Sequence, residues 1–273
     1  MKNAFTVDLE DWYNVYNFSR AINREDWESL ESRVERNTAR LLEILSKRGV
    51  KATFFVLGWI AERRPGLVRE VESAGHEIAS HGYSHRLLTE MTPDSFSAEL
   101  DRSLGILRGI VKQDLAGFRA PSFSLTGETM WAVEILRRKG IKYDSTIFPT
   151  TVHPDYGLGG SPLTIHELAE NFWEVPLSCL PVLKWNVPFS GGGYFRLLPY
   201  RVTKKFFESF NRKAGPVVFY LHPWELDPGQ PRVRGVPWSK RFRHYVNLDK
   251  TEGRLDRLLG DFEFVTVRDL LGR

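Results

Sequence analysis

Residues 52–85, ATFFVLGWIAERRPGLVREVESAGHEIASHGYSH, contain a complete strand–helix–strand unit. Ala52–Leu57 is a short run of mostly apolar residues, as expected for a buried strand. Pro65–Ala74 has a proline at its start and Gly75 directly after it, which predicts a short helix. Glu77–Ser80 then predicts a second strand. This succession is typical of two parallel strands joined by a crossover helix, the unit from which α/β folds are built.

The same alternation of strands and helices extends to both sides of this stretch. Further strands are predicted at Ala4–Asp8, Gly117–Ala120, Lys142–Ser145, Phe172–Leu177, Pro216–Leu221 and Phe264–Val267. Further helices are predicted at Arg36–Arg48, Pro93–Val111 with Thr92 as its N-cap, Gly127–Lys139 and near Pro199–Lys213. The segment Phe148–Trp173 is rich in Pro, Gly and His and predicts a long surface loop. We therefore expect an α/β fold of barrel type in a single domain covering residues 1–273.

Composition narrows the class of protein further. With 273 residues, 42% of them hydrophobic and 26% charged, the chain is globular and neither disordered nor fibrous. The longest nearly apolar run, Thr53–Ala61, is too short for a membrane helix, and the acidic residues from Asp8 onward argue against a signal peptide. A single cysteine, Cys179, excludes an intrachain disulfide framework. We expect a cytoplasmic location.

The chain is mildly basic, with a formal net charge of +4. Much of the excess lies in Arg232–Arg257, where lysines and arginines outnumber Asp249, Glu252 and Asp256. A solvated face is one explanation of this segment, and a patch for an anionic glycan, a lipid phosphate or a membrane surface is the other. The chain has no recognised nucleic-acid motif, so we do not expect a nucleic-acid partner.

Polar residues gather where four predicted strands end. The four segments are Asp8–Trp12, Ser80–His85, Phe118–Ser122 and Tyr220–Glu225. Because barrel-type α/β folds place their active sites at the carboxyl ends of the strands, we expect these segments to converge on one site.

Two of these segments have the composition of a metal site. His81 and His85 supply two imidazoles, and a carboxylate from the first segment completes a donor set that suits zinc or another first-row divalent ion. Side chains alternate along a strand, so Asp8 and Glu10 point to the same side, whereas Asp11 lies just past the strand end. One of these three carboxylates could bind the metal and another could act as a base.

The other two segments offer groups for proton transfer and substrate contact. Arg119, if buried beside carboxylates, would keep one of them ionised, and His222 could act as a general acid. Trp224 follows His222 closely and is a candidate for lining the pocket. Aromatic side chains after the first strand could form a wall for a sugar ring: Trp12, Tyr13, Tyr16 and Phe18.

Together these motifs resemble the polysaccharide deacetylase family, with its NodB-homology domain, also called carbohydrate esterase family 4. The family's first motif, Thr-Phe-Asp-Asp-Gly, is altered here to Thr6–Asp11, which looks like the branch with allantoinase-like and peptidoglycan-deacetylase-like members. The other matching segments are His81–His85 for His-Ser/Thr-x-x-His, Arg119–Pro121 for Arg-x-Pro, Leu221-His222, and Tyr143–Thr146. Phe189–Arg196 and His222–Glu225 look like a narrower group linked to exopolysaccharide production and exosortase-type systems.

The resemblance implies a distorted (β/α) barrel of about seven strands and hydrolysis of an N-acetyl or O-acetyl group on a glycan. Because we expect no signal peptide, we expect the glycan to be met inside the cell, as a lipid-linked precursor. It also implies a family-specific extension from about residue 225. It assigns His81 and His85 to a divalent metal, with zinc expected, and Asp8 to the base, held ionised by Arg119. His222 would be the acid, oriented by Asp144. Further candidates for contact with the substrate are Trp12, Tyr83, Pro121 and Trp224.

The first motif leaves two alternatives for the metal carboxylate. Glu10 is favoured by the alternation of the strand, whereas an adjacent acidic pair would map onto Glu10 and Asp11, with Asp11 as the ligand and Glu10 as the base. We favour Asp8 as the base and leave both ligands open. Rival functions are hydrolysis of a C–N bond in a small cyclic amide or imine, and a non-catalytic glycan-binding protein.

Overall fold

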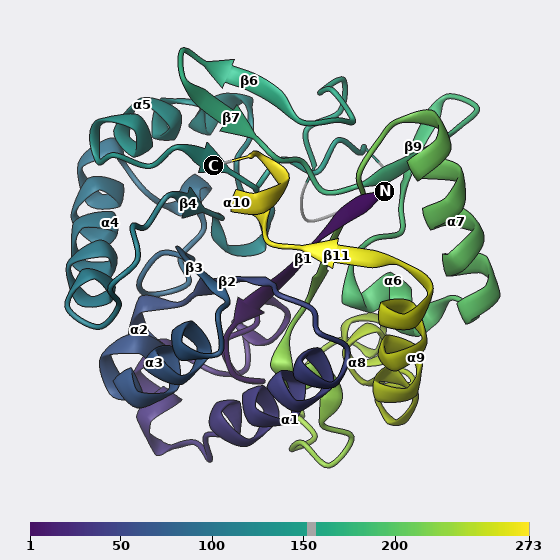
Figure 1. Cartoon of the computed structure of the whole chain (residues 1–273). Coiled ribbons are helices and arrows are strands. Elements are labelled where there is room, and N and C mark those ends of the chain that lie inside the picture. Colours follow the sequence, from purple (N-terminus) through teal and green to yellow (C-terminus); the bar gives the residue numbers. More distant parts are fainter. Residues whose placement is uncertain (152–156, 273) are drawn as a thin grey trace.

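The computed structural model describes residues 1–151 and 157–272, and one curled sheet organises them (Figure 1). The strand order is β10-β1-β2-β3-β4-β5-β7-β6, with β11 pairing with β1 as a further strand. The strands are β1 (Lys2–Leu9), β2 (Thr53–Val56), β3 (Glu77–Ser80), β4 (Gly117–Phe118), β5 (Tyr143–Asp144), β6 (His166–Ala169), β7 (Phe172–Glu174), β10 (Val218–Leu221) and β11 (Glu263–Val265). All neighbours from β10 to β7 are parallel, and β6 pairs antiparallel with β7. The predicted α/β barrel-type sheet is therefore confirmed, as an open half-barrel.

Helices surround this sheet, as expected for parallel strands joined by crossovers (Figure 1). The α-helices are α1 (Val34–Lys47), α2 (Gly58–Arg63), α3 (Pro65–Ser73), α4 (Pro93–Arg108), α5 (Trp131–Arg138), α6 (Gly192–Leu197), α7 (Tyr200–Lys213), α8 (Trp238–Tyr245), α9 (Leu248–Asp261) and α10 (Val267–Leu270). Short 3₁₀ turns are η1 (Tyr16–Phe18), η2 (Arg24–Ser29), η3 (Leu88–Glu90), η4 (Pro121–Phe123), η5 (Gly127–Thr129) and η6 (Pro223–Leu226). Thr92 caps α4 as predicted, because its side chain accepts a hydrogen bond from the Ser95 N–H.

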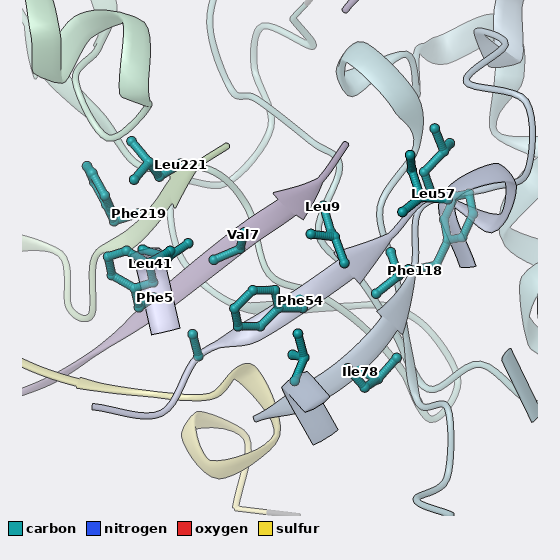
Figure 2. Close-up of a cluster of buried hydrophobic side chains, with 14 of the residues drawn as sticks. Phe5, Val7, Leu9, Leu41, Phe54, Leu57, Ile78, Phe118, Phe219 and Leu221 are labelled. Atoms are coloured by element: carbon teal, nitrogen blue, oxygen red, sulfur yellow. The ribbon is translucent and has the colours of Figure 1, made fainter. Parts of the chain in front are cut away.

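The alternation of side chains along β1 decides which of them point to each face of the sheet. Figure 2 shows Phe5, Val7 and Leu9 in one apolar cluster with side chains from neighbouring strands and helices, and all three are fully buried. The residues between them point to the opposite face, which carries Asp8. A register shift of one residue would exchange these two faces, so burial of the apolar side chains fixes the direction of the acidic ones.

The structure corrects part of the loop predicted at Phe148–Trp173. This segment contains β6 and the start of β7, which form an antiparallel hairpin with a bulge. Its residues 152–156 lie outside the described residues. A second hairpin, β8 (Cys179–Val182) with β9 (Trp185–Pro188), was also missed, as were α2, α6 and α8.

No helix in residues 1–151 and 157–272 combines the length and the apolar character that crossing a bilayer would require.

Candidate active site

A cavity of about 200 Å³ lies beyond the carboxyl ends of β1, β3 and β10. Asp8 and Glu10 reach it from the end of β1, His81 and His85 from the loop after β3, and His222 from the end of β10. These segments therefore meet at one edge of the sheet, as predicted. All five side chains are mostly or fully buried.

Glu10, His81 and His85 form a cluster with the chemistry of a metal site. One donor atom from each lies within 4.8 Å of the others, and His85 Nε2 is 2.9 Å from Glu10 Oε2. His81 Nδ1 donates a hydrogen bond to the Arg119 carbonyl at 2.8 Å, which leaves Nε2 as its ligand atom. Such an outer contact is typical of histidines that bind metals. The donor set fits a divalent ion with an open position for water.

The backbone between the two histidines is a turn, and this turn brings both imidazoles to the cavity. Gly82 has φ of +70° and His85 has φ of +55°, both in the left-handed region. His85 adopts this conformation without being glycine, which is a strained state that is common at functional sites.

Asp8 is held as a carboxylate by a buried arginine. Arg119 Nη1 is 2.7 Å from Asp8 Oδ1, and the rest of the guanidinium is fixed by Ser145. Burial alone would raise the pKa of Asp8, but Arg119, together with His81 and His222, lowers it below its usual value. The second oxygen, Oδ2, lies 3.9 Å from His222 Nε2.

Glu225 and not Asp144 holds His222. The Nδ1–H of His222 donates to Glu225 Oε1 at 2.8 Å, and Arg196 Nε binds the other oxygen of Glu225 at 2.7 Å. Burial would lower the pKa of His222, but the bond to Glu225 and the charge of Glu10 outweigh burial and raise it to about 9. His222 Nε2 then faces Glu10 Oε1 at 3.2 Å. The imidazolium is therefore fixed in orientation and in charge.

We expected Asp144 to orient His222, and the structure corrects this expectation. Asp144 lies on β5, accepts a hydrogen bond from Thr146 at 2.5 Å, and is paired with the buried Glu174. Burial raises the pKa of Asp144 to about 6 and that of Glu174 well above its usual value. The charge of Asp144 contributes to the raised pKa of Glu174, and this pair lies on the strands beside Arg119 rather than at the cavity.

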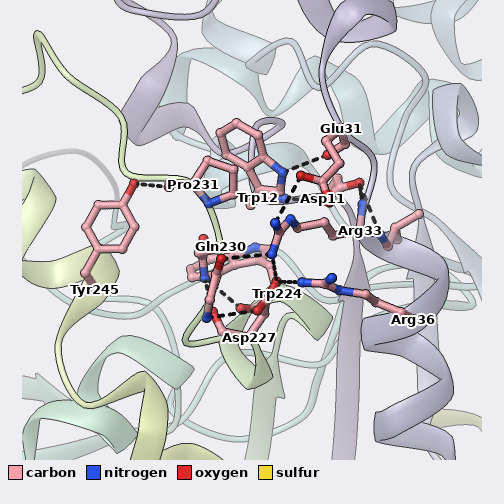
Figure 3. Close-up of polar contacts among 12 residues, drawn as sticks. Asp11, Trp12, Glu31, Arg33, Arg36, Trp224, Asp227, Gln230, Pro231 and Tyr245 are labelled. Atoms are coloured by element: carbon pink, nitrogen blue, oxygen red, sulfur yellow. Dashed lines mark hydrogen bonds and ion pairs between the residues drawn. The ribbon is translucent and has the colours of Figure 1, made fainter.

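Asp11 does not join the metal cluster, which leaves Glu10 as the carboxylate beside the histidines. Asp11 Oδ2 accepts hydrogen bonds from Ser32 and from the N–H groups of Arg33 and Val34, at the start of α1 (Figure 3). Its role in the structure is thus to cap a helix. Next to it, Arg33 and Arg36 bind Asp227, which ties α1 to η6.

Among the predicted substrate contacts, Trp224 lines the cavity and the others do not. Trp12 is buried, with its Nε1–H on the Glu31 carbonyl, and Tyr83 donates to Glu62. Pro121 is buried as well, and its neighbours Ser122 and Phe123 line the cavity in its place. Tyr16 lines it too, whereas Tyr13 and Phe18 belong to the core.

Trp224 is packed between two imidazoles. Its ring stacks on His222 at 5.0 Å and on His244 at 4.2 Å between centroids. The indole N–H is buried and has no hydrogen-bond partner in the part of the chain that the structure describes. A buried donor of this kind beside a cavity is suited to a polar group of a bound molecule.

The sequence could have indicated Glu225 as the partner of His222. It stands three residues after His222, which is the spacing of a capping box, and it follows a proline at the start of a turn. The fit of Gly192 to this arrangement is visible only in the structure, where a β-carbon at position 192 would collide with the Glu225 carboxylate.

Two family models cover most of the chain. Residues 27–144 match the polysaccharide deacetylase model, and residues 145–272 match a domain of unknown function, DUF3473.

Curated relatives point to the same family. The chain is 30% identical over 134 residues to the peptidoglycan deacetylase-like protein FGM2 of Gibberella zeae, covering 48% of this chain and 39% of that protein. It is 35% identical over 104 residues to the peptidoglycan-N-acetylglucosamine deacetylase of Bacillus cereus, covering 36% of each. The chain thus spans less than two fifths of the length of either relative.

A solved structure from Mycobacterium smegmatis, provisionally named a polysaccharide deacetylase, has the same fold. It superposes with a TM-score of 0.64 at 20% identity, over 98% of this chain and 88% of that one. These findings agree with the deacetylase motifs and do not favour the allantoinase-like alternative. Residues 27–144 are thus similar to the polysaccharide deacetylase family, and residues 145–272 are similar to the DUF3473 domain.

Proposed function

We propose that this chain is a metal-dependent hydrolase that removes N-acetyl, or O-acetyl, groups from a bacterial polysaccharide or its lipid-linked precursor. One observation carries the proposal. A two-histidine, one-carboxylate cluster, a carboxylate held by an arginine and a histidine held by a glutamate all face one cavity. The names of the peptidoglycan deacetylases among its relatives support the same reaction.

Glu10, His81 and His85 are the proposed metal ligands, with zinc as the expected ion. A divalent ion bound there would polarise the acetyl carbonyl and lower the pKa of a bound water. The outer contact of His81 with the Arg119 carbonyl fixes the tautomer that such binding needs.

Asp8 is the proposed base and His222 the proposed acid. Asp8 is kept ionised by Arg119 and can accept the proton of the attacking water through its free oxygen, Oδ2. His222 is kept protonated by Glu225 and can donate its Nε2 proton to the departing amine or alcohol. Hydrolysis of an acetamide needs one group of each kind, because the water loses a proton and the amine gains one.

The two family segments both contribute to this site. His81, His85 and Arg119 belong to the deacetylase segment, whereas His222 and Glu225 belong to the DUF3473 segment. We infer that DUF3473 supplies the acid and its orienting carboxylate, with Trp224 as a wall for the sugar. The motifs at residues 189–196 and 222–225 support membership of the narrower exopolysaccharide-linked group, as a proposal. We also propose that the protein acts in the cytoplasm, next to the inner membrane.

Two variants test these roles. His81→Ala should abolish stoichiometric metal binding, measured by elemental analysis of protein that remains soluble. Asp8→Asn should keep the metal but lower acetate release from N-acetylated oligosaccharides at least about a hundredfold, as expected for loss of a general base. Unchanged metal content in His81→Ala would show that the histidine pair is structural. Full turnover in Asp8→Asn would remove Asp8 as the base.

A further inference from the structure

Apolar side chains are exposed at the mouth of the cavity, where α6 ends and α8 begins. Trp238 is 76% exposed, Leu197 50% and Phe242 44%, and the rings of Trp238 and Phe242 stack at 5.4 Å. Leu197 and Phe242 also line the cavity. Together with the exposed Arg234 and Arg241, these residues are named the α8 rim.

The α8 rim lies in a one-sidedly charged part of the chain. Residues 228–248 contain five lysines and arginines and no aspartate or glutamate. Neither Arg234 nor Arg241 forms an ion pair with any described residue. The segment that contains the rim therefore combines an excess of positive charge with exposed apolar side chains.

This combination fits a lipid surface better than a sugar chain. Tryptophan and phenylalanine insert at the boundary between headgroups and acyl chains, and arginines bind the phosphates of anionic lipids. An exposed leucine gains nothing from contact with a hydroxylated sugar but does gain from burial in lipid. None of the five rim residues carries a carboxylate or amide side chain.

We propose that the α8 rim docks the protein on an anionic phospholipid surface, with the cavity mouth turned toward it. The inference rests on the proposed function in one respect, because docking would bring the active site to a glycan that is carried on a lipid phosphate. Docking of this kind is peripheral and depends on charge, since α8 spans only Trp238–Tyr245.

Vesicle flotation tests the docking directly. The full chain is mixed with phosphatidylcholine vesicles with or without about one third phosphatidylglycerol, at about 0.05 M and about 0.5 M NaCl. Binding is expected only to the anionic vesicles at low salt. The variant R234E/R241E should weaken it at least about tenfold, and Trp238→Ser should weaken it severalfold.

Two matched variants serve as controls. R212E/K213E reverses two exposed charges at the end of α7, which precedes β10 and so lies at the opposite end of the sheet from the cavity. Leu183→Ser removes a fully exposed leucine from the β8–β9 hairpin. Both should bind vesicles like the wild type. If the controls lose binding as much as the rim variants do, the α8 rim is not the docking surface.

Acetate release from a soluble N-acetylated oligosaccharide separates the two proposals. R234E/R241E should release acetate at the wild-type rate, because neither arginine lines the cavity. Wild-type protein that deacetylates but does not float with anionic vesicles would overturn the docking alone. Vesicle binding without any acetate release would overturn the proposed function alone. Normal flotation of R234E/R241E with a raised KM for soluble glycan would show that the rim binds sugar instead.

Discussion

Glu10 and Asp11 are adjacent in sequence, yet they serve different parts of the molecule. Glu10 faces His85 in the cavity, whereas Asp11 accepts the N–H groups at the start of α1. Glu10→Gln should therefore weaken metal binding at least about a hundredfold, because a charged ligand becomes a neutral one. Asp11→Asn should keep the metal and lower the free energy of unfolding by about 1–2 kcal/mol, through loss of the cap. Elemental analysis and urea unfolding of both variants measure this.

The reverse result would restore the alternative in which the adjacent acidic pair binds the metal. Metal loss in Asp11→Asn, with full metal content in Glu10→Gln, would show that the loop after β1 rearranges on metal binding.

Two variants distinguish Glu225 from Asp144 as the residue that orients His222. Glu225→Gln removes the charge that faces Nδ1 and breaks the ion pair with Arg196, so kcat should fall about 10–100-fold at unchanged metal content. Asp144→Asn should change kcat little, because Asp144 lies beside Glu174 and outside the cavity. Steady-state kinetics of the two variants provide the comparison. A larger loss in Asp144→Asn would mean that the family's usual carboxylate still orients the histidine here.

At the scale of elements, the sequence predicts the parts with strong periodicity well. The β2–α3–β3 unit lies within about two residues of its predicted bounds, because its apolar runs are bounded by proline and glycine. The β8–β9 hairpin escaped prediction for a physical reason. Pro181 and Pro188 lie within its two strands, and proline argues against a strand unless the strand is at an edge. The partly exposed β6 likewise has little apolar pattern.

His76, directly before β3, should make the stability of the fold depend on pH. Its Nδ1 accepts a hydrogen bond from the Ala52 N–H at 3.1 Å, and burial lowers its pKa from 6.5 to about 4. The unfolded chain thus binds the proton more tightly than the folded one. The contribution of His76 is fully present above pH 6.5 and is lost as the pH falls from there toward 4, by roughly 2–3 kcal/mol.

Urea unfolding of chelator-treated wild type and His76→Gln at neutral pH and near pH 4.5 checks this effect. Glutamine does not titrate, so the stability advantage of the wild type should shrink as the solution is acidified. The chelator removes any metal, whose release in acid would otherwise add to the difference. An advantage that stays constant over this range would show that His76 is protonated in the folded state.

At the scale of the whole molecule, the boundary between the two family segments falls inside the sheet. Residues 1–144 provide β1 to β5, and the DUF3473 segment provides β6, β7, β10 and β11, two of which pair with β1. A single domain over residues 1–273 stays a prediction. The order of motifs along the chain was enough to predict which strand ends meet, because parallel strands align their carboxyl ends. Contacts set by side-chain packing, such as Arg196 with Glu225, have no periodic signal and required the structure.

The most direct test of the proposed chemistry is acetate release by the wild-type protein from N-acetylated oligosaccharides, before and after chelation. The account predicts about one divalent ion per chain and acetate release that stops with chelator and returns when metal is added back. Acetate release that persists in fully metal-free protein would contradict it, as would a stoichiometrically loaded protein that releases none.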